Sequence, residues 1–173
     1  GKTGTQVLAA ITSFKRAGYE LEESMDMATQ ALKMTNIAEG INDAGVAAEN
    51  LIHIIKGFGE DSNFSQKILD SINQVSNTQA VDFDNLVDGA ERLSAVANQA
   101  GLSFDQMLGV LTGGYEVLGN MEKTASGLIT IFSRLRSVQL DGEEQVKGIS
   151  ELQEVFNKAT KGVVNIVDET TGQ

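Results

Sequence analysis

Apolar residues recur every three or four positions along most of the chain, which is the spacing of one face of an α-helix. The pattern is clearest between residues 64 and 135, where it forms four successive stripes. Their members are Phe64, Ile68, Ile72 and Val75; Leu86, Ala90, Leu93 and Ala97; Phe104, Met107, Leu108, Leu111 and Tyr115; and Leu128, Ile129, Phe132 and Leu135. Each stripe predicts one amphipathic helix whose apolar face is buried.

Short breaks of one kind separate the stripes, and the segment 99–108 (QAGLSFDQML) is the best example. Gly101 suits the left-handed position that follows a helix. Ser103 suits an N-cap, and Gln106 three residues later can complete a capping box. Leu102 and Met107 are spaced for a hydrophobic staple across this start. The segment 80–87 (AVDFDNLV) repeats the design around Asp82, so both segments predict a corner between two helices and not a ligand loop.

Helix starts of this type recur along the chain at intervals of 17 to 22 residues. The predicted caps are Glu20, Asn42, Ser62, Asp82, Ser103 and Asn120. Each interval holds one helix and one short connection, and a pair of helices takes about 40 residues, as in helical repeat proteins. Residues 17–29 and 100–112 match each other best, aligning Gly18 with Gly101. We therefore predict an all-α fold of about seven short antiparallel helices, in a bundle or a short α-solenoid.

The pattern changes after residue 138, which divides the chain into a helical region, 1–138, and a different region, 139–173. Residues 138–148 are polar and contain glycine, which predicts a loop or linker. A last helix is expected at 149–160. The β-branched run at 163–167 is followed by acidic and glycine turn residues, which predicts one strand of an incomplete β-hairpin.

The composition of the chain excludes several classes of function, although it says less about the fold. The chain of 173 residues has no Cys, so it has no disulfide framework and no thiolate metal site, and it has no Pro. Its formal net charge is −11, which would repel phosphate backbones and anionic lipids. No apolar run approaches the roughly 18 residues of a membrane span. We predict no nucleic-acid binding and no membrane segment.

Two short motifs resemble known ligand sites but lack essential parts. Residues 1–3 (GKT) match the end of a P-loop, without the upstream glycines or a preceding strand. Residues 82–89 (DFDNLVDG) suggest a calcium loop, but Leu86 occupies a ligand position and Gly89 comes two places late. We therefore predict no cofactor and no metal at either motif.

Other singled-out residues also favour structural roles. His53 is the only histidine and lies in an apolar helix, so we expect a partly buried residue with a satisfied ring and no catalytic part. Gly113 and Gly114 predict a close helix contact or a kink. Arg134 and Arg136 lie near a helix C-terminus, where cations favour the dipole. The segment 20–24 (ELEES) is typical of a solvated helix face. No catalytic, cofactor-binding or metal-binding residue is predicted, and the chain is expected not to be an enzyme.

The order of these patterns resembles the core region of tailed-phage tape measure proteins. The resemblance rests on a helix start of the form A-G-x-S-x-[DE]-[EQ] at 100–106. A following segment with K, L, [TS]-[IL] and R-[LI]-R lies at 119–136, and the chain also shows a D-x-x-T-G turn near its C-terminal end. Similarity of varying strength extends over most of the chain. Its Gly-Gly pair at 113–114 departs from the Ala-rich sequence that is typical there.

The resemblance implies a structural assembly protein, of which these residues would be an internal fragment. Tape measure proteins set the length of the phage tail, occupy the lumen of the tail tube and leave it when the genome is delivered. The implied partners are the tail tube protein, tail assembly chaperones and tail tip proteins, with self-association as a further expectation. The implied location is the virion tail, and the host cytoplasm during assembly.

Two other classes of function remain open on the sequence. The repeat of about 20 residues would suit a helical adaptor that presents a groove to a partner peptide or helix. Such an adaptor needs a continuous exposed groove. A peptidoglycan hydrolase would need a Glu with a raised pKa in a cleft as its general acid, and 20–24 is the acidic segment to examine.

Overall fold

The computed structural model describes residues 3–137, 139–140 and 144–145, and the described part is all-α apart from two very short strands. Its helices are α1 (Gly4–Arg16), α2 (Leu21–Ile37), α3 (Ala44–Phe58), α4 (Phe64–Thr78), α5 (Phe83–Gln99), α6 (Phe104–Leu118) and α7 (Met121–Ser137). The strands β1 (Gln139–Leu140) and β2 (Glu144–Gln145) pair antiparallel. The prediction of an all-α fold with about seven helices is confirmed.

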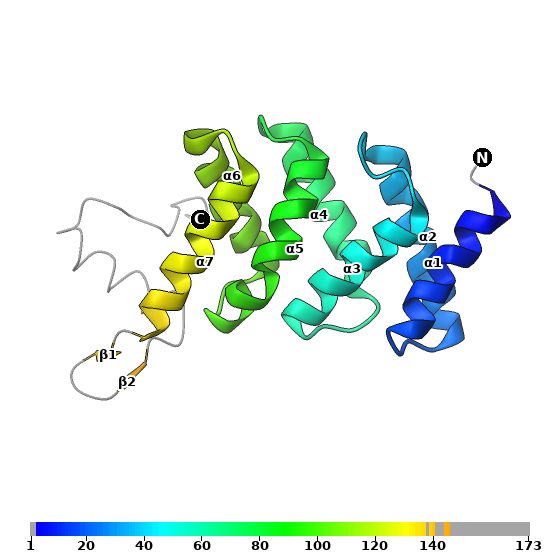
Figure 1. The fold of residues 1–173 in the computed structure, drawn as a ribbon, viewed down its shortest axis with the longest axis horizontal. Helices are drawn as coiled ribbons and strands as arrows, with labels where there is room; N and C mark the ends of the chain where they lie inside the picture. Colours follow the sequence, from blue (N-terminus) through cyan, green and yellow to red (C-terminus); the bar gives the residue numbers. More distant parts are fainter. Residues whose placement is uncertain (1–2, 138, 141–143, 146–173) are drawn as a thin grey trace, which may run out of the picture.

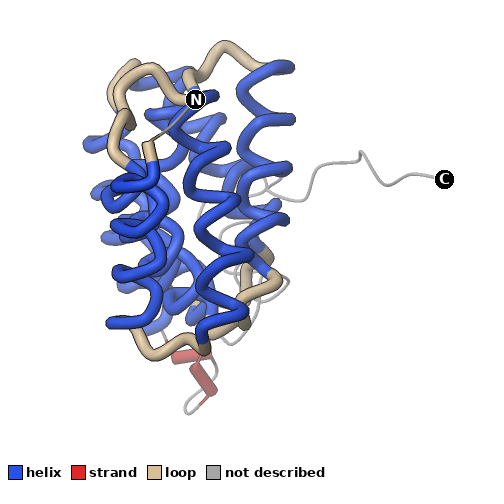
Figure 2. The backbone as a smooth tube through the Cα atoms, turned by 90° about the vertical axis from the view of Figure 1, so that its right-hand side faces the viewer, coloured by secondary structure: helices blue, strands red, loops and turns tan. Residues whose placement is uncertain are grey.

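The helices form a short α-solenoid and not a closed bundle. The most extensive contacts between second neighbours join α1 to α3, α3 to α5 and α5 to α7, while α2, α4 and α6 contact one another much less. Figure 1 shows the resulting row of helix pairs, and Figure 2 shows its two layers of helices from the end. The odd-numbered helices lie close together, whereas the even-numbered helices spread apart. The layer of α2, α4 and α6 is therefore the more open of the two.

The predicted helix starts agree with the structure to within one residue. The N-caps Glu20, Asp82 and Ser103 are where they were expected, and α7 begins directly after Asn120, whose Oδ1 accepts the amide of Lys123 at 2.8 Å. The third and fourth helices begin one residue later than predicted, after Asp43 and Asn63. Asp43 replaces Asn42 as the cap because its Oδ1 accepts the amides of residues 45 and 46.

The corner at residues 99–108 has the predicted geometry. Gly101 has a φ of 79°, in the left-handed region that favours glycine. The Ser103 side chain accepts the amide of Gln106 at 3.2 Å, and the Gln106 side chain accepts the amide of Ser103 at 2.9 Å. Leu102 and Met107 are both buried. The capping box that was predicted here therefore begins α6. The matching segment at 80–87 differs, because Asp82 makes no side-chain cap bond.

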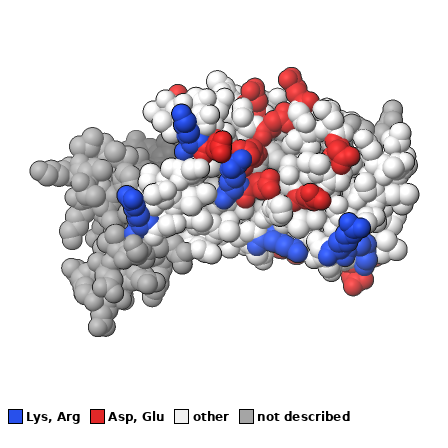
Figure 3. Space-filling model, in the orientation of Figure 1, with Lys and Arg blue, Asp and Glu red and all other residues white. Residues whose placement is uncertain are grey.

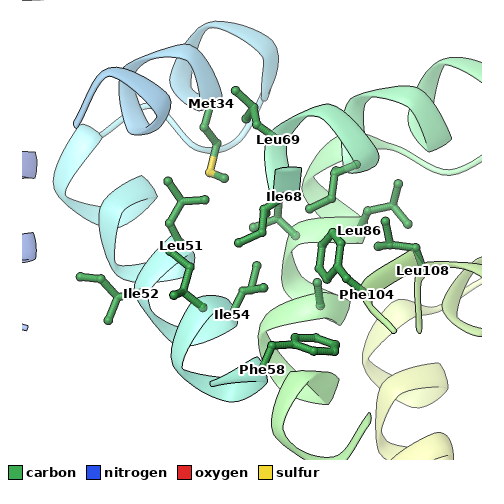
Figure 4. Packing of buried hydrophobic residues seen from close by; sticks show 14 of the residues in the cluster. Met34, Leu51, Ile52, Ile54, Phe58, Ile68, Leu69, Leu86, Phe104 and Leu108 are labelled. Atoms are coloured by element: carbon green, nitrogen blue, oxygen red, sulfur yellow. The ribbon is translucent and has the colours of Figure 1, made fainter. Parts of the chain in front are cut away.

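One hydrophobic core runs through the described helices from α1 to α7. The stripe residues up to Phe132 lie in this core or pack against it, and Ile68, Ile72, Leu86, Leu93 and Leu111 are among those with no exposed surface. Figure 4 shows side chains from α2 to α6 meeting between the two layers. Phe58, Phe64 and Phe104 form an aromatic cluster there, with ring centroids 5.6–5.9 Å apart. This cluster joins the end of α3 and the start of α4, which are consecutive in the chain, to the start of α6.

Small residues allow the close approach of neighbouring helices. A side chain on Gly57 of α3 would collide with Ser94 of α5. A Cβ on Gly89 of α5 would lie 2.6 Å from the sulfur of Met121 in α7. These glycines explain why the odd-numbered layer packs more tightly than the even-numbered layer.

The C-terminal region departs from the prediction at the point where it is described. Residues 139–140 and 144–145, which were expected to be loop, pair as a minimal antiparallel ladder. The predicted last helix at 149–160 and the predicted strand at 163–167 lie outside the described residues. The division of the chain at residue 138 stays a prediction. None of the described helices is long and apolar enough to cross a membrane.

Candidate interaction surface

A groove runs along the open side of the even-numbered layer, between α2 and α4. It consists of three adjoining hollows with volumes of about 520, 240 and 350 Å³. The first two share Gln66, and the second and third share Ile37 and Asn73. The groove therefore continues from the start of α2 to the connection between α4 and α5, and we call it the α2–α4 groove.

The lining of the α2–α4 groove is mostly polar, and nearly all of its charged residues are acidic. Lys33 is the one basic residue that lines the three hollows. The acidic residues that line them are Glu20, Glu22, Glu23, Asp26, Glu39, Asp70, Asp82 and Asp84. A groove of this charge favours a basic or neutral polar partner and disfavours phosphate and other anions.

Glu23 lies at one end of the groove and forms hydrogen bonds at the starts of α2 and α4. One of its carboxylate oxygens accepts the backbone amide of Glu20 at 2.9 Å, and the other accepts the hydroxyl of Ser62 at 2.9 Å. Both bonds lower the pKa of Glu23 below its ordinary value, and the bond from the Glu20 amide is the larger cause. A general acid needs a raised pKa, so Glu23 is unsuited to the hydrolase role considered for residues 20–24.

Asp84 lies at the other end of the groove and fixes the connection between α2 and α3. Its Oδ2 accepts the backbone amides of Glu39 at 3.0 Å and Gly40 at 3.1 Å. Asp84 also lies in the first turn of α5, where the helix dipole favours a negative charge. Its bonds to a segment about 45 residues away could not be foreseen, because no local pattern identifies a long-range partner for a carboxylate.

The single histidine is more exposed than expected. The side chain of His53 is 58% accessible, and its Nδ1 is paired with a carboxylate oxygen of Glu91 across α3 and α5. The expectation of partial burial was wrong, because His53 lies on the solvent side of an otherwise apolar helix. The expected partner for the ring is present, and the pair links α3 to α5 at the surface.

The two adjacent glycines of α6 have different surroundings. A Cβ on Gly114 would lie 2.6 Å from Cγ2 of Thr124 in α7, whereas a Cβ on Gly113 would meet nothing within 4 Å. Helix α6 runs without a break from Phe104 to Leu118. Gly114 therefore makes the close helix contact that was one of the two alternatives predicted from the sequence. Helix α6 does not end at the glycine pair.

The remaining motifs do not form a ligand site or a metal site in the described part of the chain. Of residues 1–3, only Thr3 is described, and it precedes α1 as the N-cap residue. Asp82 and Asp84 of the calcium-like motif lie at a helix start, and no group of three or more His, Asp or Glu among the described residues could hold a metal ion. Side chains beyond Arg134 at the end of α7, including that of Arg136, are not described.

The face formed by the odd-numbered helices carries both signs of charge. In Figure 3 acidic side chains gather near the middle of this face, with Lys and Arg on either side of them. Several are paired, such as Arg92 with Asp88 at 2.9 Å. This face is a solvated surface without a continuous basic stripe, which would be the electrostatic footprint of a nucleic-acid-binding protein.

Together these features define a class of protein, a helical repeat array that offers extended surfaces for packing and assembly. The family model described as phage-related minor tail protein matches residues 1–173, so the chain belongs to that family. It is thus a structural protein of the phage tail, as the sequence had indicated at this coarser level. No curated protein and no solved structure matches the chain.

Proposed function

We propose that the chain is part of a tape measure protein, which sets the length of the phage tail. The observation that carries this proposal is the repeat of the fold. Odd-numbered helices begin at residues 4, 44, 83 and 121, so each added pair of helices extends the stack by a nearly constant segment of chain. A protein built from equal units can encode a length by the number of its units. Membership of the tail protein family supports the same role.

The proposed role includes occupancy of the tail tube lumen until the genome is delivered. The net charge of −11 supports this part, because an acidic occupant does not bind the DNA that follows it through the tube. The described residues offer packing surfaces and hydrogen-bonded helix corners in place of a catalytic constellation. During assembly in the host cytoplasm, the chain would associate with the tail tube protein, tail assembly chaperones and tail tip proteins.

Association with the tube is the direct biochemical test of this proposal. The purified chain is mixed with the tail tube protein of the same phage, and complex formation is followed by sedimentation and by the length of the tubes in electron micrographs. We expect the two proteins to sediment together. Tubes that assemble equally well without the chain, and never contain it, would contradict the proposal.

The α2–α4 groove favours a second candidate function, that of an adaptor for a partner helix or peptide. An adaptor needs a continuous exposed groove, and the three hollows form one. Its acidic lining specifies a basic partner. Binding of a fluorescent Lys-rich helical peptide is expected to weaken with added salt and in the double variant Glu22→Gln, Asp26→Asn. Equal binding of an acidic peptide of the same length would exclude this function.

A further inference from the structure

Helix α7 lies at the end of the described stack and has an uncovered side (Figure 1). On this side Ile131 is 40% exposed and Leu128 is only partly buried. A Cβ on Gly127 would meet nothing within 4 Å in the described part of the chain. We call these three residues the α7 side face.

The α7 side face points away from α5. Glu122 marks the side of α7 that faces α5, because its carboxylate lies 4.0 Å from the guanidinium of Arg92. Ile131 follows nine residues later in the helix, which places it about 180° around the axis from Glu122. The side face is therefore where a further helix of the stack would pack.

The residue type at Ile131 is that of an internal contact. The eleventh residue of each odd-numbered helix is large and apolar, and in α7 it is Ile131. In α1, α3 and α5 it is Phe14, Ile54 and Leu93, and none of these three has any exposed surface. Because the same position is in the core of every earlier pair, Ile131 has the residue for such a contact without the neighbour.

Gly127 repeats this relationship. It is the seventh residue of α7, as Gly89 is the seventh residue of α5. A Cβ on Gly89 would lie 3.1 Å from Leu111 of α6 and 2.6 Å from the sulfur of Met121 in α7. Helices of both layers thus cover this side of α5, whereas Gly127 is exposed.

The segment 147–156 (KGISELQEVF) has the same corner sequence as the segment before α6. Four residues match in order, namely Gly148, Ile149, Ser150 and Gln153 with Gly101, Leu102, Ser103 and Gln106. Before α6 these residues supply the positive φ and the capping box. The match predicts that Ser150 is the N-cap of the last helix, which the sequence places at 149–160.

The apolar residues of this last helix have the register of an even-numbered helix. Counted from the residue after Ser150, the apolar positions are the second, fifth, sixth and ninth, which are Leu152, Val155, Phe156 and Ala159. The buried residues of α4 occupy the same four positions, and they are Ser65, Ile68, Leu69 and Ile72. The segment can therefore bury one side in the way that α4 does.

The connection from α7 also suits a next helix of the stack. It takes 13 residues, 138–150, of which the β1–β2 hairpin uses seven, 139–145. Since Gln139 pairs with Gln145, the chain leaves the hairpin close to the end of α7. The other six residues compare with four or five in the connections 17–20, 59–63 and 100–103.

We propose that residues 151–160 form an eighth helix, which covers the α7 side face and continues the even-numbered layer beside α6. The occupant of the face is thus a segment of the same chain. The β1–β2 hairpin is then an insertion between the seventh and eighth helices. The proposal does not depend on the tape measure role, because it follows from the side face and from the sequence of the segment.

Thiol reactivity in the full 173-residue chain tests this proposal. Because the chain has no Cys, Ile131→Cys introduces a single thiol, which should react at least tenfold more slowly than that of Ser133→Cys on the exposed side of α7. Adding Phe156→Asp should remove most of this protection, because it places a charge on the buried side of the proposed helix. Asn157→Asp is the matched control, since it adds the same charge at the next residue, on the other side, and should leave the protection unchanged. Equal rates for the two single thiols, or protection that Phe156→Asp leaves unchanged, would overturn the proposal.

A pair of cysteines gives a second readout, which reports on proximity. Ile131→Cys combined with Phe156→Cys should form an intramolecular disulfide on mild oxidation, seen as a shift on a non-reducing gel. Ile131→Cys combined with Asn157→Cys has almost the same separation along the chain and should form the bond several-fold more slowly. Circular dichroism confirms that each variant is folded. Equal rates of disulfide formation in the two pairs would contradict the proposed contact.

Discussion

The hydroxyl of Ser62 donates a hydrogen bond of 2.9 Å to Oε1 of Glu23 and thereby links the segment before α4 to the first turn of α2. The second carboxylate oxygen accepts the amide of Glu20. Because α2 and α4 contact each other much less than the odd-numbered helices do, this bond is one of the few polar links across the even-numbered layer. The ionised form of Glu23 is the form that accepts both bonds.

Protonation of Glu23 is expected to weaken the fold. The folded-state pKa is lowered, so the stabilising contribution is fully present above the ordinary pKa of about 4.5 and is lost as the pH falls through the lower, folded-state pKa. Urea unfolding between pH 7 and pH 3 measures this. Glu23→Gln should be less stable at pH 7 and show a flatter pH dependence. Glu22→Gln is the control and should keep the pH dependence of the unchanged chain.

Replacement of Ser103 by Ala should remove the side-chain cap of α6. The expected loss is about 1 kcal/mol in the free energy of unfolding, because the amide of Gln106 loses its acceptor. Chemical denaturation measures it. Ser133→Ala, on the exposed side of α7, is the control and should change stability little. If Ser103→Ala reduced partner binding more than stability, the corner would be a binding site and not a helix start.

Substitution of the two adjacent glycines should have opposite effects. Gly113→Ala is expected to stabilise the protein by up to about 1 kcal/mol, because the new methyl group meets open space and alanine favours the helix. Gly114→Ala is expected to destabilise it by about 1–3 kcal/mol, because Thr124 is buried and its hydroxyl is bonded to the carbonyl of Asn120. Thermal melting of the two variants side by side compares them. Equal effects would contradict the close contact.

Removal of the Asp84 carboxylate should loosen the connection between α2 and α3. In Asp84→Ala the amides of Glu39 and Gly40 lose their acceptor, and we expect a loss of about 1–2 kcal/mol. Hydrogen exchange followed by NMR should show faster exchange at these two amides. Asp26→Ala, another acidic residue of the groove, is the control. Unchanged protection of Gly40 in Asp84→Ala would show that the bonds contribute nothing.

The helical fold was readable from the sequence because its determinants are local. Apolar spacing gives each helix its buried face, and Ser103 with Gln106 specifies a start within four residues. The match of 17–29 with 100–112 also corresponds to two equivalent corners, since Gly18 and Gly101 both have positive φ. The choice between a bundle and a solenoid was not readable, because it depends on contacts between helices about 40 residues apart.

The candidate surface was much harder to foresee. The groove lies where α2 and α4 diverge, and their divergence follows from the small residues that draw the odd-numbered helices together, such as Gly57 against Ser94. The exposure of His53 was misjudged because its neighbours are apolar on both sides in sequence. Its pairing with Glu91 depends on the packing of α3 against α5, which the sequence pattern of either helix leaves open.

Tail length in phage that carry an in-frame deletion of residues 44–82 tests the proposed function most directly. The deletion removes α3, α4 and their connections, and it joins Asp43 to the first residue of α5 as a helix cap. The proposal predicts shorter tails in electron micrographs. The change should be about 60 Å if the segment is one continuous helix in the tail, and about 10 Å if it keeps the stacked form. A duplication of the same residues should lengthen the tail. Tails of unchanged length in both variants would contradict the proposal.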